Sequence, residues 1–151
     1  PDTRILRESG LPVMTASQYD SLFRMLVVKR FDYFPRGVAE AWAEVDARPR
    51  LGLTVDRFIV LHYPAAEYFF VTPRKPYLAE HIWQGLLRAQ ADGSFDRLFH
   101  AHFDPLLRRA RLSQRRVIEL PNPMLDAVRL LPADSPWWYR PLPAPGKMPA
   151  N

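Results

Sequence analysis

The sequence has no cysteine among its 151 residues, which excludes disulfide bonds, thiolate zinc sites and a cysteine nucleophile. It has no apolar run approaching the roughly eighteen residues that a transmembrane helix needs. It also lacks the charged start and apolar core of a signal peptide. Only six glycines occur, and none forms the G-x-G-x-x-G pattern of a phosphate-binding loop. Membrane insertion is therefore not expected for the residues given.

The composition is that of a globular protein, with 48% apolar, 13% aromatic and 25% charged residues. Lysine and arginine together number 21 against 16 acidic residues, a mild net charge of +5. The densest basic cluster comprises Arg108, Arg109, Arg111, Arg115 and Arg116. A single-strand nucleic-acid surface interleaves aromatic residues with its cations, and this cluster does not. We therefore expect a solvated basic face and no nucleic-acid partner.

Apolar residues recur at helical spacing in several segments that begin or end at capping residues. The predicted helices are Asp2–Ser9, Ser17–Lys29, Val38–Ala47, Pro76 to about Asp92, Ser94 to about Asp104, and a short helix from Pro105 to Leu112. Proline suits the first position of a helix, which supports the helix that begins at Pro76. The Asp104-Pro105 pair predicts a stop and a restart, because proline disfavours a helix interior.

Five short apolar or β-branched segments are predicted to be strands. They are Leu11–Thr15, Phe31–Phe34, Phe58–Tyr63, Tyr68–Val71 and Arg116–Leu120. Helices and strands would then alternate through residues 1–50, which predicts an α/β fold with parallel strands. Eight of the sixteen prolines lie between Pro121 and Pro149, so we expect an extended, proline-rich tail after residue 120 that is disordered beyond Pro141.

No recognisable catalytic constellation is present. The four histidines lack zinc-ligand spacing, and no serine lies in a G-x-S-x-G turn, so no metal, cofactor or catalytic residue is predicted. The segment Arg30–Gly37 is the most unusual one. If Phe31–Phe34 is a parallel strand, Pro35, Arg36 and Gly37 follow its carboxyl end, where ligands of α/β sheets bind. Arg36 could grip a carboxylate or phosphate with two hydrogen bonds, or could be an exposed arginine at a turn.

Two stretches resemble a known family. One is Arg30–Gly37, which follows a helix that begins Thr15-Ala16-Ser17-Gln18-Tyr19, and the other is Pro73–Glu80, which runs into Gln90–Phe99. Together they resemble the C-terminal part of bacterial extracellular solute-binding proteins of the family 3 type, over roughly residues 1–120. The resemblance implies part of the type II periplasmic-binding-protein fold. Residues 1–57 would be a second lobe without its first strand, residues 58–120 the returning part of the first lobe, and residues 121–151 the tail.

The resemblance implies a solute-binding domain that holds a small polar or acidic ligand between two lobes, without a cofactor. It also implies a periplasmic or extracytoplasmic location and an ABC transporter permease as partner, with any export signal upstream of the residues given. Arg36 is the expected ligand contact, with Pro35, Gly37 and Thr3 near it. Members of the family often carry an aspartate for the ligand's ammonium group where Pro35 and Arg36 stand here. The cation at this position would instead attract an acid.

Two other functions stay open. A dehydratase-type or lytic enzyme on the same fold would need an acid or base, for which Asp32, Tyr33 and Glu40 are the candidates. A sensory or interaction module would use the proline-rich tail as a linker. The sequence begins with proline and lacks the front of the first lobe, so we expect a fragment with an exposed sheet edge and exposed apolar helix faces. Such a fragment is expected to be marginally stable or to self-associate.

Overall fold

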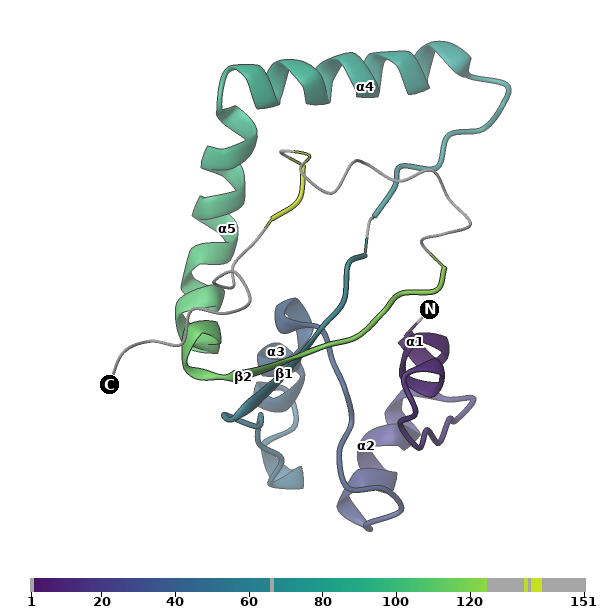
Figure 1. Cartoon of the computed structure of the whole chain (residues 1–151), viewed down its shortest axis with the longest axis vertical. Helices are drawn as coiled ribbons and strands as arrows, with labels where there is room; N and C mark the ends of the chain where they lie inside the picture. Colours follow the sequence, from purple (N-terminus) through teal and green to yellow (C-terminus); the bar gives the residue numbers. More distant parts are fainter. Residues whose placement is uncertain (1, 66, 125–134, 136, 140–151) are drawn as a thin grey trace. The chain divides into compact units, whose positions relative to one another are not determined.

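The computed structural model describes residues 2–65, 67–124, 135 and 137–139 (Figure 1). Within them the chain is mixed α/β, with five α-helices and one two-stranded parallel sheet. The helices are α1 (Asp2–Glu8), α2 (Tyr19–Val27), α3 (Val38–Asp46), α4 (Pro76–Ala91) and α5 (Ser94–Ala110). The strands are β1 (Ile59–His62) and β2 (Arg116–Glu119), and the short 3₁₀ helices are η1 (Pro49–Leu51) and η2 (Leu112–Gln114).

The chain divides into two compact units. The first contains the residues up to 65 together with those from 110 onward, and the second contains residues 66–109. The first unit therefore holds α1, α2, α3 and both strands, whereas the second holds α4 and nearly all of α5. The boundaries at residues 57 and 120 that the family resemblance implies remain predictions.

The sheet joins two segments that are far apart in the sequence. Ile59 pairs with Arg116 and His62 with Glu119, in parallel register. The ladder extends one residue beyond each end, because the Arg116 amide donates to the Phe58 carbonyl at 2.7 Å and the Leu120 amide donates to the His62 carbonyl at 2.8 Å. Figure 1 shows the two strands side by side. The predicted strands at 58–63 and 116–120 are confirmed, as is a parallel pairing, although between different segments from those expected.

The core of the first unit lies between α1 and the sheet. Ile5, Leu6 and Leu120 are buried, with Ile5 only 1% exposed. The partly buried residues around them are Leu11, Val13, Leu61, Tyr63, Ile118 and Met124. The α1 helix ends at Glu8, and Gly10, two residues later, has a φ of +79°, which suits glycine just beyond a helix end. The hydroxyl of Tyr63, just after β1, donates to the Asp2 carboxylate at 3.0 Å and ties the start of α1 to the sheet.

The helices follow the sequence pattern closely. Pro76 occupies the first turn of α4, where its missing amide hydrogen is no loss. Between α4 and α5 the chain turns sharply (Figure 1), at Gly93 with a φ of +70°. The Asp92 carboxylate accepts a 2.8 Å hydrogen bond from the Ser94 amide and so caps α5. The predicted helix break at Asp104-Pro105 is wrong, because α5 continues through Pro105 to Ala110. The proline removes one backbone hydrogen bond, and the turns on both sides remain helical.

The prediction of strands within residues 1–50 is wrong, so this part of the chain does not alternate helix and strand. Residues Leu11–Thr15 belong to no helix or strand, and Leu11 and Val13 pack on the core while Pro12 and Met14 are exposed. That alternation is typical of a strand. However, no partner strand is hydrogen-bonded to these residues in the described part of the chain.

The segment Phe31–Phe34 is not a strand either. The Phe31 and Phe34 rings approach each other, with centroids 6.3 Å apart. In a strand, residues three apart would lie on opposite faces. The φ of +57° at Lys29 turns the chain after α2, and the segment folds back so that Phe34 meets Phe23.

The third strand that was wrongly predicted is Tyr68–Val71, which has no ladder partner among the described residues. The proline-rich tail lies mostly outside the described residues, so its predicted extended conformation and the disorder expected after Pro141 remain predictions.

Replacing Ile5 with alanine tests the proposed position of the core. Because Ile5 is almost fully buried, Ile5→Ala should lower the free energy of unfolding by about 2–5 kcal/mol, measured by urea denaturation. Val28→Ala is the matched control, since Val28 is 66% exposed, and should change it by less than about 0.5 kcal/mol. Equal losses for the two variants would contradict a core centred on α1.

Candidate functional site

The segment singled out from the sequence packs against α2 and α3 through aromatic rings. Phe23 of α2 is only 3% exposed and is the buried centre of this contact. The Tyr19 and Phe34 rings approach Phe23 edge-on, with centroids 5.2 and 5.3 Å away. Such edge-to-face contacts are the favoured geometry of aromatic pairs. They hold the loop before α3 in place.

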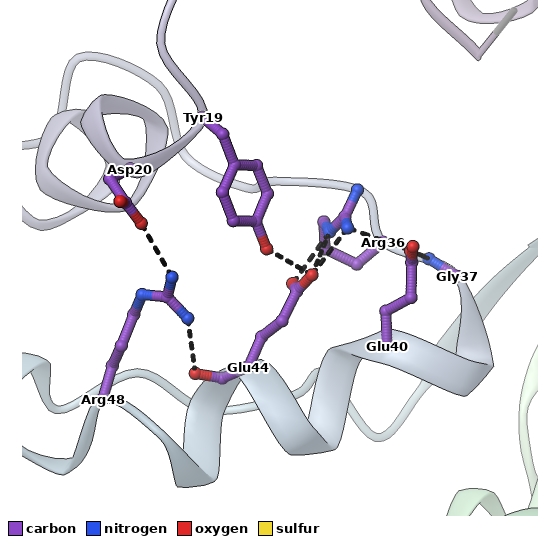
Figure 2. Close-up of polar contacts among 7 residues, drawn as sticks. All are labelled: Tyr19, Asp20, Arg36, Gly37, Glu40, Glu44 and Arg48. Atoms are coloured by element: carbon purple, nitrogen blue, oxygen red, sulfur yellow. Dashed lines mark hydrogen bonds and ion pairs between the residues drawn. The ribbon is translucent and has the colours of Figure 1, made fainter.

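Arg36 lies at the end of this loop and binds two glutamates of α3 (Figure 2). Its Nε donates to both carboxylate oxygens of Glu44, at 3.0 and 2.8 Å, and its Nη2 donates to Glu44 Oε1 at 2.6 Å. The same Nη2 lies 3.0 Å from Glu40 Oε2. Only 24% of the Arg36 side chain and 14% of the Glu44 side chain are exposed, so the pair is largely shielded from water.

Tyr19 and Arg48 complete the network. The Tyr19 hydroxyl donates to the Glu44 carboxylate. Arg48, just after α3, donates through Nη1 to the Glu44 backbone carbonyl at 3.2 Å and through Nη2 to Asp20 at 2.8 Å. The Arg48 guanidinium also lies 4.0 Å from the centre of the Phe23 ring. Hydrogen bonds and cation–π contacts therefore join α2 to α3 on both sides of Glu44 (Figure 2).

The charges of this network nearly balance. The guanidiniums of Arg36 and Arg48 face three carboxylates, those of Asp20, Glu40 and Glu44. Arg36 is thus an ion-paired cation and not the open cation that the sequence suggested for attracting an acid. Within the described residues, Arg36 makes its polar contacts through Nε and Nη2, and its Nη1 can still donate hydrogen bonds.

The network shifts the pKa values of its members in the directions that ion pairing requires. The hydrogen bonds from Arg36 hold the pKa of Glu44 below its ordinary range, against the opposing effect of burial. The same hydrogen bond with Glu44 raises the pKa of Arg36. Partial burial and the bond to Glu44 raise the pKa of the Tyr19 hydroxyl. All three residues therefore keep their charge states at neutral pH.

Gly37 is the N-cap of α3, in an extended conformation with φ of −60°. Its amide donates to Glu40 Oε2 at 3.2 Å, so the glutamate three residues into the helix caps the helix start. A Cβ added at Gly37 would come within 3.1 Å of that oxygen, which is tighter than ordinary contact. Arg36 and the amide at the start of α3 therefore both already bind carboxylates of α3.

The other predicted site residues do not all gather here. Pro35 lies next to Arg36 and is exposed. Thr3 lies in α1, and no contact with residues 35–37 is recorded for it. The enzyme candidates Asp32 and Tyr33 are exposed, with Tyr33 at 51%. The expected grouping of Thr3 with the loop thus remains a prediction.

Sequence reasoning missed Tyr19, Glu44 and Arg48 as neighbours of Arg36. Tyr19 lies in the predicted helix Ser17–Lys29, and nothing in that helical pattern indicates a partner for its hydroxyl. A signal for Glu44 exists, because Arg36, Glu40 and Glu44 are spaced by four residues and so continue along one face of a helix. The same four-residue spacing continues to Arg48, which binds the Glu44 carbonyl, whereas its contact with Asp20 of α2 is long-range and has no local signal.

One member of the basic cluster has a structural role. Arg115 Nε donates to the Ala110 carbonyl at 2.6 Å, and its Nη1 donates to the carbonyl of Asp56. Its guanidinium lies 5.9 Å from the Trp42 ring.

In the described part of the chain, no group of three or more histidine, aspartate or glutamate side chains could hold a metal ion. No helix there combines the length and apolar character needed to cross a membrane.

Comparison with known proteins found no matching family model, no matching curated protein and no matching solved structure.

Removing the carboxylate of Glu44 tests the network. Glu44→Gln should lower the free energy of unfolding by about 1–3 kcal/mol at pH 7, because partly buried Arg36 then loses its less exposed charge partner and keeps only Glu40. In the native chain the lowered pKa of Glu44 makes its contribution complete above its ordinary pKa of about 4.3. That contribution is lost as the pH falls through the lower folded-state pKa.

Urea denaturation at a series of pH values between about 7 and 3 measures this effect. The Glu44→Gln variant should lose less stability on acidification than the native chain. Glu67→Gln is the control, since Glu67 is exposed and lies outside the network. Identical acid dependence in Glu44→Gln and the native chain would show that the ion pair does not stabilise the fold.

Proposed function

We propose that this chain is part of a solute-binding receptor, and that the loop of Pro35, Arg36 and Gly37 forms part of its ligand site. The observation that carries the proposal is the fixed position of this loop. Arg36 is held by Glu44 on one side and lies over the Tyr19 and Phe34 rings, 5.3 and 5.4 Å from their centres. Binding residues are commonly found on loops that a rigid scaffold positions.

Fixing a loop before its ligand arrives lowers the entropy lost on binding. The polar groups of the loop follow an exposed tyrosine, Tyr33, two residues before Pro35 in the sequence, and small-molecule sites combine aromatic side chains with a few polar groups. Tyr33 is 51% exposed, and the Glu40 side chain is exposed to the same extent. Arg36 Nη1 supplies a further donor. These groups together suit a small solute that carries both acceptors and donors.

The charge balance narrows the chemical class of this solute. Since Glu40 and Glu44 already neutralise Arg36, the loop offers no net positive charge to a multiply charged anion. A neutral or zwitterionic polar solute avoids repulsion from the two glutamates, and its acceptor can still bind Arg36 Nη1. We therefore favour a small polar solute over a strongly acidic one.

The receptor proposal extends to the family resemblance of the sequence. In that reading the chain forms part of a type II periplasmic-binding-protein fold, works outside the cytoplasm and passes its solute to a transporter permease. The mixed α/β architecture and the parallel strand pair, joined through a helical crossover, are compatible with this reading. No specific observation favours the enzyme or the sensory module as a second function.

A thermal-shift screen of the whole chain tests the proposal, using amino acids, small amides, sugars and dicarboxylates as probes. A solute present at one hundred times its Kd should add about 2.7 kcal/mol to the free energy of unfolding. For a chain of this size that corresponds to a rise in Tm of roughly 5–10 °C. Zwitterionic or neutral polar probes should give larger shifts than dicarboxylates.

Tyr33→Ala should reduce the shift at a fixed solute concentration and leave the Tm without solute almost unchanged, because Tyr33 is exposed. Tyr77→Ala is the matched control, since Tyr77 is an exposed tyrosine of the second unit, at 80%. It should retain the full shift. The absence of a shift with every probe, or an equal loss in both variants, would count against this loop as a ligand site.

A further inference from the structure

Among the described residues, the most exposed run of adjacent aromatic side chains lies in the segment Tyr68–Val71 of the second unit. Tyr68 is 54% exposed, Phe69 is 70% exposed and Phe70 is 97% exposed. The segment contains no charged or polar-uncharged residue other than the tyrosine hydroxyl. Three adjacent aromatic residues in water are costly, because each can bury on the order of 150–250 Å² of surface.

The backbone of this segment is also unpaired. It lies outside the helices and strands, and no backbone-to-backbone hydrogen bond is recorded between residues 68–71 and the rest of the described chain. Tyrosine, phenylalanine and valine have high strand propensity. An exposed extended segment of such residues offers free N–H and C=O groups to another strand.

We propose that Tyr68–Val71 is a self-association surface, on which the same segment of a second copy of this chain pairs as an antiparallel strand. A two-fold axis makes the two strands antiparallel and uses the same surface of both copies. The inference concerns a different unit from the proposed ligand loop and is independent of the proposed function.

The sequence of the segment suits pairing with itself in one register. A two-fold axis between Phe69 and Phe70 sets each Phe69 opposite the second copy's Phe70, and each Tyr68 opposite the second copy's Val71. Aromatic pairs of this kind are among the stabilising cross-strand pairs.

The charges at the two ends agree with the antiparallel direction. Glu67 precedes the segment, and Arg74 and Lys75 follow it beyond Pro73. Antiparallel pairing brings the acidic end of each copy to the basic end of the other. Parallel pairing in register would instead place Glu67 against Glu67 and the two basic ends together, which costs free energy.

The area also favours a second copy. Three aromatic residues from each copy, at the exposures above, could remove at most on the order of 1,000 Å² from solvent. That figure lies near the lower limit for a specific interface between proteins. The resulting dimer is expected to be in reversible equilibrium with the monomer.

Cysteine cross-linking tests the register, and the chain contains no native cysteine to interfere. Opposite residues of an antiparallel pair have side chains on the same face of the sheet. A mixture of the Phe69→Cys and Phe70→Cys chains should therefore form a disulfide-linked dimer under mild oxidation. Each variant alone should form several-fold less, because residue 69 of one copy and residue 69 of the other then lie on opposite faces.

Sedimentation velocity over a range of concentrations tests the association itself. The native chain should show a concentration-dependent dimer, and Phe70→Lys should weaken the association at least tenfold. Phe70 is almost wholly exposed, so this change should leave the fold intact, which circular dichroism would verify. Leu98→Lys is the matched control, since Leu98 is 71% exposed on α5 of the same unit, and it should associate like the native chain.

A monomer at all concentrations would overturn the proposal. So would a dimer that Phe70→Lys leaves intact, or one that Leu98→Lys weakens as much, because association would then use another surface. Equal cross-linking in the mixed and single cysteine samples would overturn the antiparallel register.

Discussion

The parallel pairing of β1 with β2 is the constraint on which the first unit depends. It joins Ile59 to Arg116, two residues 57 positions apart, and so brings the chain from residue 110 onward back to the N-terminal part. Parallel strands cannot be joined by a tight turn. The whole of the second unit lies in the connection between them. Without this pairing Leu120 would not reach Ile5 and Leu6, and α1 would have no core to cover.

The N-terminal part is held by side-chain contacts between helices where the sequence suggested a sheet. The Tyr19 and Phe34 rings contact Phe23, and the guanidinium of Arg36, paired with Glu44, lies over these two rings. The apolar contacts exclude water from the ion pair, and a partly dehydrated bidentate pair is stronger and more directional than an exposed one. This cooperation explains how residues 31–37 keep a defined conformation without belonging to a helix or a strand.

A two-stranded parallel sheet is an unusual structure, because parallel strands normally lie within larger sheets covered on both faces. Here β1 and β2 are only partly buried, and aromatic residues remain exposed in both units. In the proposed ligand loop, ion pairs and hydrogen bonds already fix the polar groups. In the proposed self-association surface, the aromatic side chains remain exposed within the described chain.

Local sequence signals predicted most of the helices and two of the β-rich segments correctly. Helical spacing, Pro76 at a helix start and glycine after a helix end predicted α1, α3 and α4 to within a residue or two. The β-rich segments around Ile59 and Val117 were also identified, whereas Arg36 was singled out by its position after Phe31–Phe34, which is not a strand. These features depend on neighbouring residues, which a single sequence displays directly.

Contacts between segments distant in the sequence determine which β-rich segments form strands and which group binds Arg36. Leu11–Thr15, Phe31–Phe34 and Tyr68–Val71 have strand-like residues, but a strand exists only when a second segment supplies the ladder, and that depends on distant parts of the chain. The spacing of the residues alone did not identify the partner of Arg36 either. Its spacing from Glu44 permits an ion pair, but the rings of Tyr19 and Phe34 exclude water from it, and they meet there because α2 and α3 pack around Phe23.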